Sequence, residues 1–447
     1  MITIPKAIQE IIHRLEDNGH TAYVVGGAVR DCCLGKKPQD WDIATSAHPQ
    51  IIVALFPDAH QIGAKFGTIS VPTKTLGVVE ITTFRAEGPY TDGRHPDYVH
   101  YSADLTRDLS RRDFTCNALA YHPAKGLIDP FDGLVDLRQG VLRSVGRPED
   151  RLQEDTLRVL RAFRLQTTLE LTLDRSLAKA LCQKGPRLAK LPPQRIGGEM
   201  YKLLQHPKAY KGIRRLHAAG LLPYVLPELA RCYGLEQNHY HTYTVYGHTL
   251  VAMKHAAPNL EVRTALLLHD LGKGAMDKQT GGVRRFWGHQ NHSAQLANVI
   301  LLRWAWPSKS REQIVRLVGE HMFYWPTAPT DKTLHRFIAK IGPDLILPLL
   351  EIRRADIIAL GPSGKARLEP WDQLRFRIEK ILTASPIFSL QDLAINGKIL
   401  MAELGLPEGP EVGKLLRALL ESVLSEEVPN ETRALLEYAK KYGPNSQ

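Results

Sequence analysis

The segment VVGGAVRDCCLGKKPQDWD, residues 24–42, decides the fold of the N-terminal part of this chain. It predicts an apolar strand that leads into Gly26 and Gly27, a turn with a short helix, and a second strand that ends in the triplet DWD. Side chains alternate between the two faces of a strand, so the carboxylates of Asp40 and Asp42 should point the same way. The sequence therefore predicts a carboxylate pair beside a backbone that two glycines leave uncovered.

Two carboxylates on one face can hold divalent cations against a triphosphate. Mg²⁺ prefers one or two protein carboxylates together with phosphate oxygens, and a pair of ions can activate an attacking hydroxyl and stabilise the leaving oxygen. DxD alone is common in surface loops and GG alone usually marks a turn, but the two at this spacing are a rarer combination. Glu80 is the candidate third carboxylate if its strand lies beside the DxD strand; the alternative is an edge-strand charge.

The length and charge of the chain indicate a large basic protein. Its 447 residues are enough for about three domains of ~150 residues each. It carries 58 Lys and Arg against 47 Asp and Glu, a formal net charge of +11. A basic surface of this kind attracts polyanions such as nucleic acid, although a solvated surface without a partner has the same composition.

The cysteine content indicates a reducing compartment, and the hydropathy indicates no membrane span. The five cysteines form no CxxC pair and no ladder of disulfide spacings, and two of them, Cys32 and Cys33, are adjacent. The first residues predict an amphipathic helix with acidic residues rather than a signal peptide. No apolar run approaches the ~20 residues that a membrane span needs. We therefore expect a cytoplasmic protein without membrane contact.

Strand and helix signals are unevenly distributed along the chain, which predicts an α+β fold. Up to about residue 150, β-branched runs bounded by turn residues predict strands that alternate with helices. From about residue 151 the strand signals vanish and apolar residues recur at i, i+3 and i+4, so the remainder should be helical. The expected strands are TAYVVGG (21–27), QDWDIAT (39–45), GTISVPT (67–73) and GVVEITTFR (77–85).

Residues 111–118, RRDFTCNA, combine cationic and hydrogen-bonding side chains. Guanidinium groups such as those of Arg111 and Arg112 clamp phosphates bidentately, and the carboxylate of Asp113 can accept from ribose hydroxyls. Taken alone, RRD is more often a charge cluster at the start of a helix. After a two-carboxylate site, this motif with its Asn117 predicts a clamp for the sugar and phosphates of a nucleotide.

The motif EDTLR, residues 154–158, opens the helical part of the chain. Asp155 and Arg158 are three residues apart, so on a helix they project from one face as neighbours. A carboxylate accepts from an exocyclic amine and an arginine donates to a ring nitrogen or carbonyl, so this pair could accept cytosine and adenine and refuse guanine and uracil. The alternative is a surface ion pair of Arg158 with Asp155 or Glu154, with a contribution of a few tenths of a kcal/mol.

Five motifs of this chain, in their order and spacing, resemble those of class II tRNA nucleotidyltransferases, the family of CCA-adding enzymes. They are GGAVRD, DWD, RRDFTCNA, DPFDG and EDTLR. The likeness continues more loosely to a tail, DLAINGKILMAELGLPEGPEVGKLL. It implies a polymerase-β-like nucleotidyltransferase palm, with a small mixed sheet and helices, followed by an all-α neck, HD body and tail. The implied domains are a head over 1–150, a neck with the base-selecting motif over 151–225, an HD-type body over 226–365 and a tRNA-binding tail over 366–447.

The resemblance assigns roles residue by residue. It implies that Asp40 and Asp42 bind catalytic Mg²⁺, whereas Glu80 as third carboxylate remains an inference from its strand. The implied partners are the 3′ end of tRNA, CTP and ATP. The matching nucleotide-binding residues are Gly26, Gly27, Arg30 and Asp31 of the phosphate-binding turn, Arg111, Arg112, Asp113 and Asn117 of the ribose and phosphate clamp, and Glu154, Asp155 and Arg158 of the base-selecting motif.

Two further segments bear on the kind of family member. Bacterial poly(A) polymerases have a basic stretch where this chain has GAKFGTISV, residues 63–71, and the FGT version resembles tRNA nucleotidyltransferases. CC-adding members lack much of the loop that this chain keeps as FRAEGPYTDGRHPDYVHYS, residues 84–102. A mobile loop of this length suits a pocket that changes from C to A. A-adding members also keep it, so CCA addition and addition of A alone both remain open.

A second chemical signal is a set of histidines and aspartates in the expected body. Their order, His, His-Asp, a later His and a later Asp, resembles the HD phosphohydrolase superfamily. Such ligands suit one transition metal ion or a pair, and a metal-bound water could attack a phosphoester. Lys273, one turn after the His-Asp pair, could bind phosphate. The expected ligands are His248, His269, Asp270, His289 and Asp356, with His321 as the competitor of His289.

Three functions therefore compete. The first is Mg²⁺-dependent addition of C, C and A, or of A alone, to the 3′ end of tRNA, with bases selected by the protein. The second is an RNA-binding HD metallophosphohydrolase with a degenerate head, against which the intact DxD pair argues. The third is a non-catalytic RNA-binding protein, against which the full set of acidic and basic groups argues. The resemblance also associates the HD domain with a secondary phosphohydrolase activity.

Overall fold

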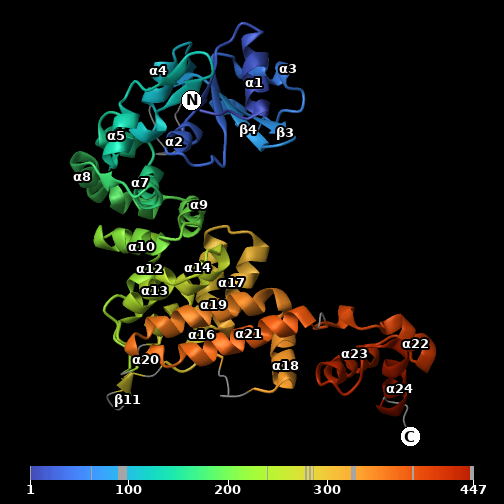
Figure 1. Ribbon diagram of the computed structural model, residues 1–447. Helices are drawn as coiled ribbons and strands as arrows, with labels where there is room; N and C mark the ends of the chain where they lie inside the picture. Colours follow the sequence, from blue (N-terminus) through green and yellow to red (C-terminus); the bar gives the residue numbers. More distant parts are fainter. Residues whose placement is uncertain are drawn as a thin grey trace. The chain divides into compact units, whose positions relative to one another are not determined.

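The computed structural model describes residues 2–61, 63–88, 98–238, 240–276, 279–280, 283–284, 286–323, 329–384 and 387–442 (Figure 1). The chain divides into two compact units, Met1–Pro227 and Glu228–Gln447, and each is described by itself. The loop expected over residues 84–102 falls in part, at 89–97, outside the described residues. No helix of the described part is long and apolar enough to cross a membrane.

A six-stranded mixed sheet forms the centre of the head (Figure 1). Its strand order is β3-β4-β2-β1-β7-β8; β2 and β4 are parallel, and every other neighbouring pair is antiparallel. This confirms the predicted α+β class with a small mixed sheet at the N-terminus. The strands are β1 (Ala22–Val25), β2 (Asp42–Thr45), β3 (Thr68–Thr73), β4 (Gly77–Thr83), β7 (Ala120–His122) and β8 (Gly126–Ile128).

The apolar residues of the sheet and of its helices explain why this part folds. All four residues of β1 are buried, as expected for a central strand covered on both faces. Helix α1 (Lys6–Glu16) buries the stripe Ile8, Ile11, Ile12 and Leu15, whose spacing places these side chains on one helical face. The other helices of the head are α2 (Gly27–Cys33), α3 (Pro49–Leu55), α4 (Leu105–Ser110) and α5 (Gly133–Gln139).

Two of the expected strands differ from the observed ones. The strand expected over residues 39–45 begins only at Asp42, so the DxD pair precedes and starts β2 rather than ending it. The reason is pairing: Asp42 lies opposite Val25, the last residue of β1, so β1 offers no partner for the residues that precede Asp42. The run expected over 77–85 divides into β4 and β5 (Arg85–Glu87), which pairs with β6 (Val99–Tyr101).

The rest of the first unit is almost entirely helical. Among the described residues, the prediction of no strands after residue 151 is wrong for three two-residue strands. β10 (Thr172–Leu173) pairs with β9 (Val141–Leu142), and in the second unit β11 (Gln279–Thr280) pairs with β12 (Val283–Arg284). Such short pairs lack the periodicity that marks a strand in sequence. The helices are α6 (Pro148–Glu154), α7 (Leu157–Thr168), α8 (Arg175–Lys184), α9 (Pro193–Leu204), α10 (Ala209–Ala218) and α11 (Leu222–Val225).

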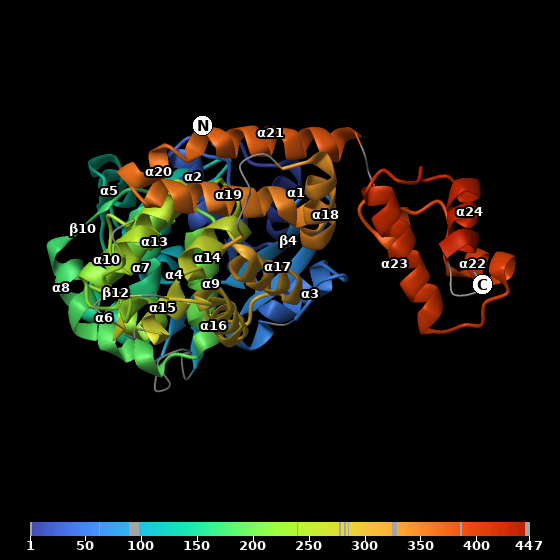
Figure 2. The ribbon, with the colours of Figure 1, turned by 90° about the horizontal axis from the view of Figure 1, so that it is seen from below.

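Apart from the short strands β11 and β12, the described part of the second unit is built from helices. α21 (Leu368–Ala384) runs alongside α19 (Pro343–Ala359) in both views (Figure 2). The remaining body helices include α13 (Val245–Lys254), α14 (Leu260–Leu268), α15 (Leu271–Ala275), α16 (His289–Arg303), α17 (Ser308–Glu320) and α18 (Asp331–Ile341). The last three helices, α22 (Gly397–Leu404), α23 (Pro410–Leu424) and α24 (Thr432–Tyr442), pack around a separate apolar cluster that includes Leu400, Leu419 and Leu435.

Candidate active site and histidine cluster

A cavity of about 1050 Å³ lies in the first unit and is lined mainly by polar and charged side chains. Residues of β1, β2, β4, α7 and α9 contribute to its lining. Of the predicted nucleotide-site residues, those that line it are Gly26, Gly27, Arg30, Asp31, Asp40, Asp42, Glu80, Arg111, Arg112, Asp113, Asn117 and Arg158. Glu154 and Asp155 are not among the lining residues.

The three predicted carboxylates meet at one side of this cavity. Asp42 and Glu80 are directly paired residues of the parallel strands β2 and β4, so their side chains leave the sheet on the same face. Asp40 lies two residues before Asp42 and is exposed to the cavity. Burial raises the pKa of Asp42 to about 6; the charges of Glu80 and Asp40 raise it, and Arg112 lowers it. A divalent cation would relieve this concentration of negative charge.

Gly26 is required by both its conformation and its surroundings. Its backbone angles, φ 75° and ψ −133°, belong to a region that residues with a Cβ rarely adopt. A Cβ at this position would lie 2.9 Å from Nη1 of Arg112 and 4.0 Å from Oδ2 of Asp42. The glycine turn therefore lets a guanidinium and a carboxylate approach the backbone at the point where β1 ends.

A buried carboxylate that sequence reasoning missed positions the two arginines of RRDFTCNA. Asp108, on α4, is fully buried; Arg111 donates to it from Nε and Nη2 at 3.0 and 2.8 Å, and Arg112 donates from Nη2 at 3.3 Å. Burial alone would raise the pKa of Asp108, but the two guanidinium groups outweigh it and lower the pKa. Asp108 thus remains ionised and orients both arginines at the cavity wall.

Asp113 joins the turn after the two glycines to the helical part. Its carboxylate accepts from Nδ2 of Asn117 at 3.0 Å and from Nη1 of Arg161 at 2.9 Å. Asn117 in turn accepts from Arg30 at 2.6 Å, and Arg30 also donates to Asp31. Burial would raise the pKa of Asp113, but Arg161 and Arg158 outweigh it and lower the pKa to about 2. Asp113 and Asn117 of the predicted clamp are therefore members of one hydrogen-bonded network with Arg30 and Asp31 of the glycine turn.

The predicted arrangement of Asp155 and Arg158 on one helical face is wrong. α6 ends at Glu154 and α7 begins at Leu157, so Asp155 lies in the link between two helices. The cause is local, because the Asp155 carboxylate accepts from the backbone N–H of Leu157, the first residue of α7. Arg158 donates to Glu154 at 2.6 Å, which is one of the two ion pairs considered as the alternative. Asp155 instead accepts from Arg195 at 2.9 Å.

The helices α7 and α9 supply further charged residues that sequence reasoning missed. Arg161 and Arg164 follow Arg158 at intervals of three residues along α7, a helix that is mostly buried. In the sequence, this regular spacing of arginines is the signal that could have indicated them. Both approach the buried carboxylate of Glu199 on α9: Arg164 donates at 2.6 Å and Arg161 lies at 3.5 Å. Burial would raise the pKa of Glu199, but these arginines lower it. Lys202, one turn later on α9, lines the cavity.

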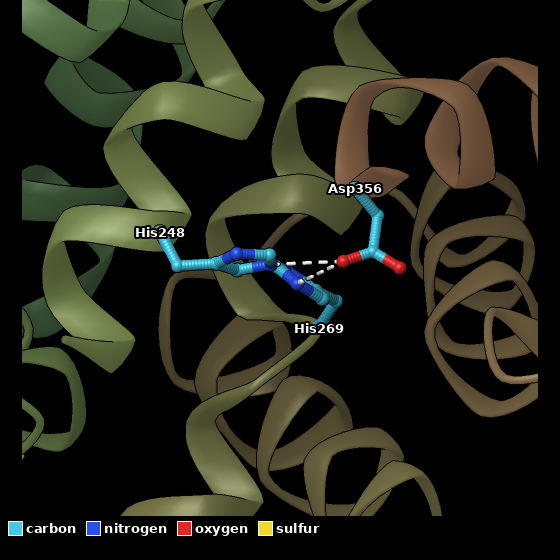
Figure 3. A group of neighbouring side chains, drawn as sticks. All are labelled: His248, His269 and Asp356. Carbon is cyan, nitrogen blue, oxygen red and sulfur yellow. Dashed lines mark hydrogen bonds and ion pairs between the residues drawn. The ribbon is translucent and has the colours of Figure 1, made fainter. Parts of the chain in front are cut away.

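The second unit brings the predicted histidines and aspartates together in its interior. His248 of α13, His269 at the end of α14 and Asp356 of α19 point toward one another (Figure 3). Nε2 of His248 lies 2.8 Å from Oδ1 of Asp356, and Nε2 of His269 lies 3.9 Å from the same oxygen. All three are buried, and their ligand atoms are close enough to hold one metal ion.

Asp270 lies between this group and two further histidines. Its Oδ1 is 3.1 Å from Nε2 of His289 and 3.9 Å from Nε2 of His321, so the structure places both expected competitors at the same carboxylate. Burial would raise the pKa of Asp270, but His269 and Lys273 outweigh it and hold the pKa well below its usual range. Burial and the charges of His269 and His289 lower the pKa of His321 to about 3, which leaves its ring neutral.

Gly272 and Lys273 complete this histidine cluster. A Cβ at Gly272 would lie 2.4 Å from the carbonyl oxygen of His289, so glycine permits the close contact between α15 and α16 that positions His289. Nζ of Lys273 donates to Oδ2 of Asp270 and to Oε1 of Gln237, both at 2.8 Å. The lysine predicted to bind phosphate is therefore directed at the cluster through Asp270.

Three protein-family models match parts of the chain. The Poly A polymerase head domain matches residues 22–143, the Probable RNA and SrmB-binding site of polymerase A matches residues 170–233, and tRNA nucleotidyltransferase domain 2 matches residues 295–439. With the mixed sheet, the carboxylates and the arginine-lined cavity, these matches define a nucleotidyltransferase with a polymerase-type head.

Full-length relatives then specify the family. A CCA-adding enzyme of Limosilactobacillus reuteri is 31% identical over 434 residues, 96% of this chain and 94% of the relative. An A-adding tRNA nucleotidyltransferase of Deinococcus radiodurans is 34% identical over 449 residues, covering 95% and 97% of the two chains. The crystal structure of the Bacillus stearothermophilus CCA-adding enzyme in complex with CTP superimposes with a TM-score of 0.70, at 29% identity and 98% coverage of each chain. The chain belongs to the tRNA nucleotidyltransferase family of the CCA-adding enzymes.

Proposed function

We propose that this enzyme adds C, C and A in sequence to the 3′ end of tRNA, with CTP and ATP as donors. The observation that carries the proposal is the meeting of Asp40, Asp42 and Glu80 in a cavity whose other walls carry arginines and lysines. Carboxylates and phosphate oxygens together are the ligands that Mg²⁺ prefers. Bound Mg²⁺ would supply activation of the tRNA hydroxyl and stabilisation of the leaving phosphate oxygen.

Different residues of the cavity would serve different parts of the nucleotidyl transfer. The 3′-hydroxyl of the tRNA attacks the α-phosphorus, a new P–O bond forms, the bond to the β-phosphate breaks, and pyrophosphate leaves as the hydroxyl loses its proton. Arg111 and Arg112, oriented by Asp108, would neutralise phosphate charge. Asp113, with its pKa near 2, stays ionised and would accept from ribose hydroxyls at any physiological pH.

We propose that Asp155 and Arg158 select the base, with Glu154 as the residue that positions Arg158. Their present partners support this assignment, because Glu154 and Arg195 hold the two side chains in defined positions at the end of α6. A base could then replace these partners through hydrogen bonds that it offers with the same polarity. Replacement of Asp155 or Arg158 by Ala should raise incorporation of U and G relative to C and A about 5- to 150-fold, the equivalent of about 1–3 kcal/mol. Unchanged selection would refute the assignment.

The alternative within the family is addition of A alone. Relatives of both kinds resemble this chain to a similar degree, at 31% and 34% identity. The experiment that decides uses tRNA transcripts that lack all three, two or only the last of the CCA nucleotides, with labelled CTP or ATP. Extension of the shortest transcript with CTP is the expected result. Extension of only the longest transcript, and only with ATP, would show an A-adding enzyme.

For the second unit we propose a transition metal site in the histidine cluster, with phosphoester hydrolysis as a secondary activity. The residues His248, His269, Asp270, His289 and Asp356 are buried together, although buried charged groups are costly unless they are paired or bind metal. A metal-bound water of lowered pKa would supply the nucleophile. Loss of phosphatase or 2′,3′-cyclic phosphodiesterase activity in His269→Gln, with nucleotidyl transfer retained, is the expected result. Equal hydrolysis by variant and wild type would refute it.

The basic composition supports tRNA as the macromolecular partner. The net charge of +11 attracts a polyanion, and we propose that the body and the tail helices α22–α24 contact the tRNA. The five free cysteines are consistent with the reducing cytoplasm that we propose as the location. The affinity for tRNA should rise as the salt concentration is lowered. An affinity that does not depend on salt would contradict this proposal.

A further inference from the structure

The cavity of the first unit has room for more than one nucleotide. Its volume of about 1050 Å³ exceeds the ~300–1,000 Å³ that a site for one small ligand usually encloses. The head lines one part of it with the glycine turn, the carboxylates and the segment RRDFTCNA. Helices α7 and α9 line another part, and of their lining residues only Arg158 belongs to the predicted nucleotide site. The others include Arg161, Arg164, Thr168 and Lys202.

Most cations of this cavity are already committed to a carboxylate. The pairs are Arg111 and Arg112 with Asp108, Arg158 with Glu154, Arg161 with Asp113, and Arg164 with Glu199. Among the described residues, three lysines line the cavity without an ion pair: Lys36, Lys37 and Lys202. Lys36 and Lys37 lie between α2 and β2, in the head, whereas Lys202 belongs to α9. Lys202 is therefore the uncommitted cation that the helices offer to the cavity.

The charge of Lys202 reaches the carboxylates at which we propose that Mg²⁺ binds. Burial raises the pKa of Asp42 to about 6, and the positive charges of Arg112 and Lys202 act against this rise. Burial would raise the pKa of Glu199 as well, but the arginines of α7, with Lys202, lower it. The Lys202 side chain is itself exposed. Its ammonium group is thus free to meet a ligand that lies between α9 and the reacting groups.

Nucleotidyl transfer requires a second substrate in this cavity. The attacking 3′-hydroxyl must come within about 3–3.5 Å of the α-phosphorus, so the last nucleotide of the acceptor strand must enter beside the carboxylates. A phosphodiester on the other side of the same ribose joins this nucleotide to the rest of the strand. Its negative charge would approach Asp40, Asp42 and Glu80, and a cation is needed to balance it. The phosphodiester is present whichever base is last, so one cation can serve every addition.

We propose that Lys202 binds the phosphodiester of the last acceptor nucleotide and thereby positions the attacking hydroxyl. The inference rests on the proposed nucleotidyl transfer and adds a residue that binds the acceptor rather than the incoming nucleotide. A lysine suits this position, because its ammonium meets a phosphate as a point charge on a flexible stem. The triphosphate is instead met by guanidinium groups that Asp108 holds in place. Contact with a phosphate carries no sequence information, so Lys202 has no part in base selection.

The test removes the charge from either side of this contact in the full-length enzyme. The acceptor is a tRNA that lacks only its last nucleotide, extended with labelled ATP, because CCA-adding and A-adding enzymes both use it. A second acceptor carries a neutral methylphosphonate in place of the last phosphodiester. Lys202→Met should lower kcat/KM for the normal acceptor about tenfold and reduce its slope against log salt concentration by about 1. The methylphosphonate should cost the wild type about tenfold and cost Lys202→Met nothing further, since both changes remove one contact.

Two control variants and a binding measurement complete the test. Lys202→Arg keeps the charge and should restore most of the activity. Lys179→Met removes an exposed lysine of α8 that does not line the cavity, and it should stay within twofold of wild type. Calorimetry should show unchanged affinity of Lys202→Met for ATP without tRNA.

Three results would overturn the proposal while nucleotidyl transfer stands. The first is an unchanged kcat/KM in Lys202→Met, or an equal loss in Lys179→Met. The second is a methylphosphonate effect that adds in full to that of Lys202→Met. The third is lost affinity for ATP, which would assign Lys202 to the triphosphate. A wild-type enzyme that extends no acceptor would overturn the proposed function itself.

Discussion

Acidification should weaken binding of metal in the head, because Asp42 takes up a proton. Burial, with the charges of Glu80 and Asp40, raises the pKa of Asp42 to about 6 against the effect of Arg112. A group of this pKa is about 90% ionised at pH 7 and about 10% ionised at pH 5, so apparent affinity for a divalent ion should fall about tenfold below its fully ionised limit at pH 5, or about 1.4 kcal/mol. The proton held by Asp42 must leave when the ion binds.

Replacement of Glu80 by Gln tests the physical cause. Two unit charges about 6 Å apart at an effective dielectric constant of about 20 interact by roughly 3 kcal/mol. Because solvent in the cavity screens this interaction, removal of the Glu80 charge should lower the pKa of Asp42 by about 1. Protons released on binding at pH 5 should therefore fall from about 0.9 to about 0.5 per ion in Glu80→Gln. The affinity of this variant also falls through loss of a ligand, so proton release is the cleaner quantity.

Calorimetric titration with Mn²⁺ in two buffers of different ionisation enthalpy measures the proton release. A His269→Gln background reduces the contribution of the histidine cluster, and Asp58→Asn, which removes an exposed carboxylate of the head, serves as the matched control. Wild-type-like release is expected in the control. Absence of proton release at pH 5, or release unaffected by Glu80→Gln, would refute the view that Asp42 and Glu80 share one electrostatic site.

Three further changes test other parts of the structure. Gly26→Ala introduces a clash with Arg112 and backbone strain of about 1–2 kcal/mol, and nucleotide incorporation should fall at least tenfold; wild-type rates would contradict the turn assignment. Arg161→Met should lower the free energy of opening of α7 by about 3 kcal/mol at pH 7, measured by hydrogen exchange, because buried carboxylates lose their partner. Since folding lowers the pKa of Asp113 to about 2, the ion pair of Asp113 with Arg161 stabilises the fold above about pH 4, and this stabilisation is lost as the pH falls toward 2. Hydrogen exchange of α7 without this pH dependence would show that the ion pair is not the cause. Gly272→Ala should separate α15 from α16 and reduce the metal content of the second unit; full retention of metal would show that this contact is dispensable.

The sequence predicted the components of the head site better than their connections. The glycine turn and the carboxylate pair follow from local spacing, whereas the position of Glu80 depends on parallel pairing of β2 with β4, which no local pattern contains. Asp108 carries no local signal for its function, because only the folded chain shows that it is buried beneath two arginines. The ion pair of Arg161 with Asp113 joins residues 48 positions apart and was equally inaccessible.

One error of interpretation has a simple structural cause. The three-residue interval between Asp155 and Arg158 suggested a continuous helix, but α6 ends at Glu154, and the Asp155 side chain accepts from the backbone N–H of Leu157, where α7 begins. The sequence order of His289 and His321 contains no geometry, so it could not show that both lie beside Asp270. His289 begins α16 and His321 directly follows α17, so two neighbouring helices joined by a short turn bring both histidines to the same end.

We propose that three carboxylates in the head hold metal ions beneath a triphosphate. A crystal structure of the protein with CTP and Mg²⁺ would show whether they do. We expect a triphosphate against Gly26 and Gly27, with Mg²⁺ bound to phosphate oxygens and to Asp40, Asp42 and Glu80. A triphosphate bound elsewhere, or ions that contact none of these carboxylates, would contradict it.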